Sequence, residues 1–165
     1  MRVAVVCYSL QGGTYGAAKD AADALGADLV RLEPAKPYPT KTASMYFWCG
    51  KSAVFREAPR LAPYRFEGEY DAVVLATPIW AGTFAPPLRT FLRQNRGRIR
   101  KAALLACCGG GEADKCFAGI ARQIPGVPVL GRLRLVLPDP GSGNAEAVAR
   151  FCAGIRDALG ADEAH

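Results

Sequence analysis

The chain has 165 residues, half of them hydrophobic, and a formal net charge of +6. This length suffices for a hydrophobic core without cross-links, and no apolar stretch is long enough to cross a bilayer. The first residues lack the basic, apolar and small-residue regions of a secretory signal, so we expect a cytoplasmic protein with no membrane span. The basic residues are scattered along the chain rather than gathered in one block, which disfavours nucleic acid as a partner.

The first patterned segment, from Val3 through Thr14, changes character midway. Residues 3–7 are mostly β-branched or small and show no alternation, which indicates a parallel strand buried on both faces. Alanines then recur at helical spacing up to Leu25, and Gly26 is placed to end that helix. The intervening loop therefore directs backbone N–H groups, hydroxyls and the positive helix end toward one point. Such a loop suits a phosphate, although a glycine turn that binds nothing fits the same residues.

The rest of the chain alternates strands with helices. Strands are expected over residues 27–32, 71–76, 101–108 and 127–137, and helices over residues 40–48, 86–95, 114–123 and 144–159. A turn at 139–143 precedes the last helix, and a frayed tail at 160–165 follows it. This alternation with right-handed crossovers predicts an α/β fold, a five-stranded parallel sheet layered between helices, in a single domain over residues 1–165.

Residues 34–69 form the least regular stretch and contain the aromatic run Tyr46-Phe47-Trp48. Two interpretations fit this run. It could be a helix face packed on the sheet with a solvated basic rim, which we favour, or a surface on which a partner docks.

The first, third and fourth predicted strands end in unusual sequence, whereas the second and fifth end plainly. In an open parallel sheet, ligands bind beyond the carboxyl ends of the strands, where the strand order reverses. The order 2-1-3-4-5 places the three unusual ends side by side. We therefore expect that order and a binding site at that edge.

Several chemistries are disfavoured by the residues present. The only histidine, His165, is terminal, which argues against a catalytic triad, and no credible zinc ligand set occurs. A phosphatase with a nucleophile at Cys7 would need an arginine six residues later, where Gly13 stands. Most of the six cysteines lie in or beside apolar runs with no Cys-x-x-Cys pair, so we expect reduced, structural thiols, the adjacent Cys107 and Cys108 included.

Taken together, the motifs resemble the flavodoxin family over nearly the whole chain. Residues 9–14 resemble that family's phosphate loop, Ala76 to Thr83 resembles its second flavin loop, and Cys107 to Gly111 stands where the third loop should be. Gln11 departs from the family pattern, which usually has a hydroxyl there. The resemblance implies a flavodoxin-like three-layer sandwich with flavin mononucleotide (FMN) as its cofactor, no metal and no catalytic side chain.

By the same resemblance, three loops share the contacts to FMN. The phosphate would be held by Ser9, Gln11, Gly12, Gly13 and Thr14. The isoalloxazine would be lined by Thr77, Pro78, Ile79 and Trp80, with Gly82 near its reactive nitrogen. The pyrimidine edge would be closed by Cys108, Gly109 and Gly110. An indole offers a stacking face, and glycines let backbone donors approach a planar ligand closely.

The resemblance implies a monomeric electron-transfer protein that shuttles one or two electrons between redox partner proteins. The positive net charge favours an acidic partner. An FMN-dependent NAD(P)H oxidoreductase acting on quinones or free flavin is the main alternative, although no nicotinamide motif is present. A binding module for a phosphorylated ligand, without redox chemistry, is the third.

Overall fold

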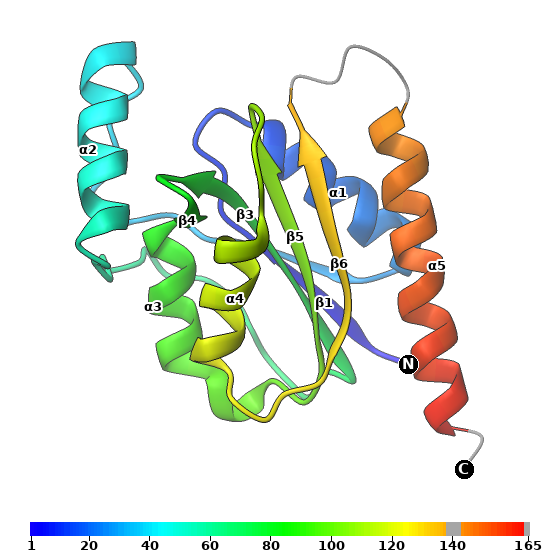
Figure 1. Cartoon of the computed structure of the whole chain (residues 1–165). Coiled ribbons are helices and arrows are strands. Elements are labelled where there is room, and N and C mark those ends of the chain that lie inside the picture. Colours follow the sequence, from blue (N-terminus) through cyan, green and yellow to red (C-terminus); the bar gives the residue numbers. More distant parts are fainter. Residues whose placement is uncertain (138–142, 164–165) are drawn as a thin grey trace.

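A computed structural model describes residues 1–137 and 143–163, which form an α/β sandwich (Figure 1). Parallel strands make up the main sheet: β1 (Val3–Cys7), β2 (Asp28–Arg31), β3 (Ala72–Trp80), β5 (Ala102–Cys108) and β6 (Val129–Val136). The short strand β4 (Thr83–Phe84) pairs antiparallel with β3. The helices are α1 (Gly13–Leu25), α2 (Thr42–Val54), α3 (Pro86–Asn95), α4 (Asp114–Gln123) and α5 (Gly143–Glu163), with a 3₁₀ turn, η1 (Arg96–Arg98), after α3.

The strand order of the main sheet is β2-β1-β3-β5-β6. The five parallel strands correspond to the five expected from the sequence, so the predicted order 2-1-3-4-5 is confirmed. The antiparallel strand β4 is an addition that was not predicted.

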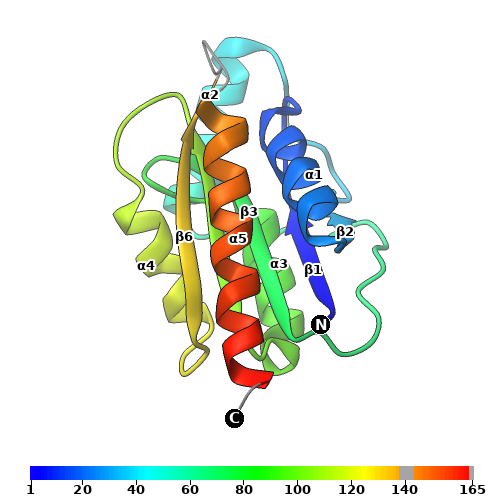
Figure 2. The same cartoon turned by 90° about the vertical axis from the view of Figure 1, so that its right-hand side faces the viewer.

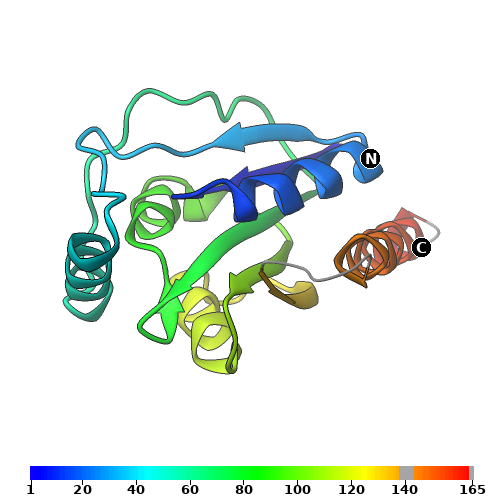
Figure 3. The same cartoon turned by 90° about the horizontal axis from the view of Figure 1, so that it is seen from above.

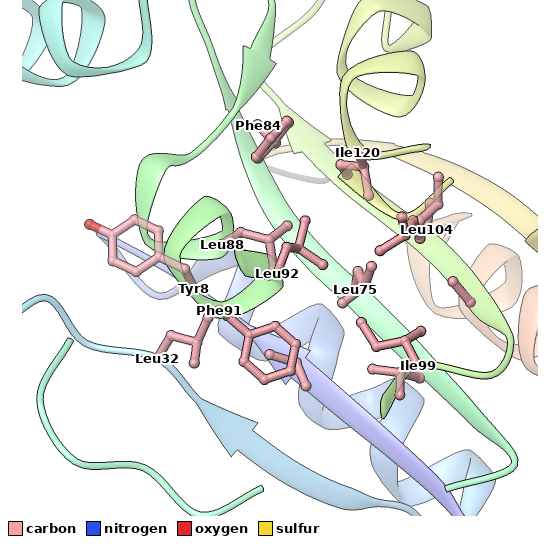
Figure 4. Packing of buried hydrophobic residues seen from close by; sticks show 14 of the residues in the cluster. Tyr8, Leu32, Leu75, Phe84, Leu88, Phe91, Leu92, Ile99, Leu104 and Ile120 are labelled. Carbon is pink, nitrogen blue, oxygen red and sulfur yellow. The ribbon is translucent and has the colours of Figure 1, made fainter. Parts of the chain in front are cut away.

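Both faces of the central strands are buried, and successive residues pack against different helices. Val73, Leu75 and Leu104 lie in a cluster with Leu88 of α3 and Ile120 of α4 (Figure 4). Val74 and Leu105 lie in a second cluster with residues of α1 and α5. Figures 2 and 3 show α1 and α5 together on one face of the sheet. Burial on two faces explains why these strands show no polar alternation.

Three expected boundaries are wrong. Helix α2 continues to Val54 rather than ending near residue 48, and α5 continues through residues 160–163, which were expected to fray. Residues 77–80, expected as a loop, belong to β3, because Thr77 and Pro78 pair with β5 and the next two residues pair with β4. The predicted turn at 139–143 lies outside the described residues except for its last position, and so do residues 164–165 of the predicted tail.

The aromatic run of α2 is exposed, not packed on the sheet. Tyr46, Phe47 and Trp48 expose 70%, 63% and 48% of their surface, and the inward face of α2 consists instead of Cys49, Ser52 and Ala53. The favoured interpretation of this run was therefore wrong: the small residues face the protein because they let the helix approach closely.

No helix within the described ranges is long and apolar enough to cross a membrane.

Two valine truncations should separate the central sheet from the exposed helix surface. Val74 is fully buried on β3, so Val74→Ala should lower the free energy of unfolding by about 2 kcal/mol. Val54 is 64% exposed at the end of α2, so Val54→Ala should change it by less than about 0.5 kcal/mol. Urea unfolding followed by circular dichroism measures both, and equal losses would contradict the assigned core.

Candidate functional site

The sheet register brings the three loops named above to one edge. Cys7 is aligned with Ala76 on the neighbouring strand β3, and Pro78 is aligned with Cys107 on β5. The segments that follow these positions therefore leave the sheet side by side, at the upper edge in Figure 1. The predicted meeting of the loops at the carboxyl edge is thus correct.

The loop between β1 and α1 is closed by its own hydrogen bonds. Gly12 adopts a left-handed backbone with φ of 96°, and its N–H donates to the Ser9 hydroxyl at 3.0 Å. The N–H groups of Gly13, Thr14 and Tyr15, in the first turn of α1, have no acceptor among residues 1–137 and 143–163. These amides are unpaired because the first turn of a helix has no preceding carbonyls to bind, and they sit at the positive end of the α1 dipole.

The side chains of this loop are less available than its backbone. Ser9 and Thr14 are buried, and the Thr14 hydroxyl lies beside the Cys107 thiol. The Gln11 amide is exposed and donates to the sulfur of Met45 on α2 at 3.3 Å. A Cβ atom at Gly13 would lie 2.8 Å from Leu137 Cδ1, so the loop has little space for a side chain there. Any anion in this loop would meet chiefly backbone N–H groups.

The second loop is a tight β-hairpin rather than an irregular connection. Trp80 pairs with Thr83, and the two residues between them, Ala81 and Gly82, have φ values of 48° and 77°. Thr77 is fully buried, and its hydroxyl donates to the Pro78 carbonyl at 2.9 Å and accepts from the Ala85 N–H at 3.0 Å. The Thr77 side chain therefore anchors the hairpin, while Pro78, Ile79 and Trp80 are half-buried and Gly82 is exposed.

Trp80 belongs to a cluster of three aromatic rings that sequence reasoning missed. Its ring centroid lies 5.5 Å from that of Tyr8 and 5.1 Å from that of Tyr38, both nearly perpendicular to it. The Tyr38 hydroxyl is hydrogen-bonded to Ser52 of α2 at 2.8 Å. Burial raises the pKa of both tyrosines, so they stay neutral at physiological pH. Tyr8 directly follows β1, which is a usable signal, but nothing in the sequence around Tyr38 places it here.

The third loop is built on a glycine run. Cys108 is half-buried, with its thiol 3.7 Å from the Leu135 carbonyl, and its own carbonyl accepts from the Leu137 N–H at 2.8 Å. Gly109 and Gly110 are exposed, and φ of 152° at Gly110 is favoured only by glycine. The carbonyl of Gly111 accepts a hydrogen bond from Arg134 on β6.

All six cysteines are free thiols, as expected from the sequence. Burial raises the pKa of Cys7 and Cys107 to about 11 and that of Cys116 to about 12. These thiols are therefore protonated at neutral pH. Within the described ranges, no cluster of His, Cys, Asp or Glu could hold a metal ion.

The three loops thus present unpaired backbone N–H groups, a half-exposed indole and exposed glycines at one edge. No Asp, Glu, His, Lys or Arg occurs in residues 9–14, 77–83 or 107–111. This arrangement can hold a planar ligand that carries a phosphate, and it offers no general acid or base.

No protein-family model and no curated protein matches the chain. Solved structures do. The FMN complex of a flavoprotein from Lactobacillus acidophilus matches with a TM-score of 0.71 at 17% identity, over 81% of this chain and 92% of that one. A flavodoxin from the Archaea matches with a TM-score of 0.60 at 15% identity, over 96% of this chain and 99% of that one. Two-electron reduced Megasphaera elsdenii flavodoxin matches with a TM-score of 0.56 at 15% identity, over 92% of this chain and 99% of that one. The protein has the flavodoxin-like fold.

Thiol reactivity should report on the third loop. Cys108 is the only half-exposed cysteine, and the other five are buried. With a disulfide reagent at pH 8, Cys108 should react first, because its thiol is accessible, whereas burial shields Cys107 and raises the pKa of its thiol to about 11, which keeps it protonated. Cys108→Ser should remove the fast phase and Cys107→Ser should leave it intact. A fast phase that survives Cys108→Ser would show that this loop is misplaced.

Proposed function

We propose that this protein binds FMN at the edge formed by the three loops and carries electrons between redox partners. The observation that carries the proposal is the set of unpaired N–H groups at the start of α1 on the same edge as the half-exposed Trp80. When bound, FMN supplies reversible one- or two-electron chemistry, and the chain positions it.

The phosphate would be held by the loop of residues 9–14. Its negative charge would meet the N–H groups of Gly13, Thr14 and Tyr15 and the positive end of α1. The hydrogen bond from Gly12 to Ser9 fixes the loop before any ligand arrives, which lowers the ordering cost of binding. Gln11 would add the second N–H of its amide, since the first already donates to the Met45 sulfur.

The ring system would lie between the hairpin and the glycine loop. Tyr8 and Tyr38 contact Trp80 edge-on and so fix the orientation of its indole. Cys108, Gly109 and Gly110 would approach the pyrimidine edge through their backbone, as Gly82 would approach the reactive nitrogen. Thr77 would hold the hairpin in position through the hydrogen bond that its hydroxyl accepts from the Ala85 N–H.

An electron carrier suits this site better than an enzyme. The three loops bear no carboxylate, imidazole or amine that could act as a general acid or base, and their only titratable groups are thiols. The net charge of +6 favours docking on an acidic redox partner.

The chain offers a matched pair of tryptophans to test FMN binding, because it contains only Trp48 and Trp80. Trp80→Ala should weaken FMN binding about tenfold or more, since it removes a fixed aromatic face. Trp48→Ala should leave the affinity unchanged, because this residue lies on the exposed face of α2. Titration of flavin-free protein, followed by flavin fluorescence, measures both. A wild-type protein that takes up no FMN refutes the proposal.

Turnover separates the carrier from the oxidoreductase. The FMN-loaded protein alone should not sustain NADH or NADPH oxidation with a quinone or free flavin as acceptor, yet it should accept electrons from dithionite and pass them to cytochrome c. Absorbance changes of the nicotinamide and of the flavin measure the two processes. Steady nicotinamide oxidation at many turnovers per flavin would assign the oxidoreductase function instead.

A further inference from the structure

A cavity of about 380 Å³ opens beside the hairpin, and of the three proposed FMN loops only the second lines it, through Ala81, Gly82 and Thr83. It lies between the end of α2, the β3–β4 hairpin, α3 and α4. Four of its lining residues are cations: Arg56, Arg89, Lys115 and Arg122. No Asp or Glu lines it, and none of residues 9–14 contributes to it.

Arg89 is the buried member of this set. It lies on α3 with only 5% of its surface exposed, and its guanidinium sits 4.4 Å above the centre of the Phe84 ring. Its Nε has no hydrogen-bond partner within the described part of the chain. Burial, Arg93 and Arg56 all lower the pKa of Arg89, while the Phe84 ring favours its charge. A buried, uncompensated guanidinium is costly, and an anion would remove that cost.

The other three cations also lack partners. Arg56, Lys115 and Arg122 are exposed and form no ion pair with a carboxylate among residues 1–137 and 143–163. Some cations elsewhere on the protein are paired, for example Arg100 with Glu69 at 2.7 Å, but no carboxylate of the described residues reaches any of the four cations at this cavity. Four like charges around one cavity repel one another, and a shared anionic ligand would offset that repulsion.

The backbone is shaped to bring these charges together. Gly119 of α4 faces the hairpin so closely that a Cβ there would lie 3.2 Å from the Phe84 ring. This contact places Lys115 and Arg122, which lie on the same helix, at the cavity. The described non-glycine residues with left-handed φ, Arg56 at 52° and Ala81 at 48°, both line it as well.

We propose that this cavity binds the phosphate groups of a small molecule, with a diphosphate as the ligand class. Its volume lies in the usual range for small-molecule sites, and guanidinium and ammonium groups are the common phosphate ligands. A ligand held there would lie against the turn at Ala81 and Gly82. The proposal goes beyond the FMN site and does not depend on it.

A small molecule fits the cavity better than an acidic protein surface does. A protein carboxylate docking from outside would pair with the exposed Lys115 and Arg122 but would not reach Arg89, which is almost fully buried. Only a group that enters the cavity satisfies all four cations.

Calorimetric titration of the full chain with inorganic pyrophosphate tests the proposal. We expect saturable binding at a single site. The rim double variant Lys115→Gln/Arg122→Gln and the buried variant Arg89→Met should each weaken it at least about tenfold, since each removes charge-assisted hydrogen bonds. Arg132→Gln makes the same kind of charge change on β6, at a separate hollow beside α5, and should weaken it less than about twofold. Circular dichroism checks that every variant folds. If Arg89→Met does not fold, the result for the rim double variant decides the test.

Two further titrations identify the ligand class and the site. Succinate, a dicarboxylate, should bind more weakly than pyrophosphate, and excess FMN should leave pyrophosphate binding unchanged. The proposal is overturned by any of four results: no saturable binding, equal weakening by Arg132→Gln, succinate binding as tight as pyrophosphate, or displacement of pyrophosphate by FMN. The last would place pyrophosphate in the loop of residues 9–14. Failure to bind FMN would refute only the flavin proposal.

Discussion

The parallel pairing of β1, β3 and β5, buried on both faces, is the constraint on which the rest of the structure depends. Each of these strands is hydrogen-bonded to a neighbour on both sides and covered by helices on both faces. A one-residue slip in register would move its side chains to the opposite face and disrupt both hydrophobic clusters. The carboxyl ends of the three strands therefore stop together. The position of every loop at that edge follows from this pairing.

The polar side chains of the edge hold the loops in place. The hydroxyl of Ser9 accepts from Gly12 and that of Thr77 accepts from Ala85, while Thr14 is buried beside Cys107. The groups left for a ligand are backbone N–H groups and the face of one indole. A site made of main-chain donors on a rigid sheet needs little reorganisation on binding, which suits a protein whose task is to position a cofactor.

Two kinds of positive potential occur on this molecule. At the start of α1 it comes from uncharged peptide dipoles, which carry no titratable group and so do not change with pH. In the cavity beside the hairpin it comes from four full charges, one of them buried at Arg89. Ala81 and Gly82 of the hairpin turn line this cavity, and none of residues 9–14 does.

Local sequence was sufficient for the fold and for the edge at which the three loops meet. Apolar runs predicted β1, β3 and β5, helical spacing and Gly26 predicted α1, and glycine-rich strand ends predicted the loops that meet at one edge. These features were readable because strand and helix periodicity, together with the rule for parallel sheets, act over neighbouring residues.

Only the tertiary structure decided which side chains face that edge. Strand β4 has only two residues, and the turn before it lacks the Asn-Gly pair typical of a hairpin. The sequence therefore predicted a loop where Trp80 pairs with Thr83. The contact of Tyr38 with Trp80, the exposure of Tyr46 and the burial of Arg89 all depend on residues distant in the chain. Periodicity cannot report such contacts, because burial of a side chain is set by what packs against it rather than by its neighbours in sequence.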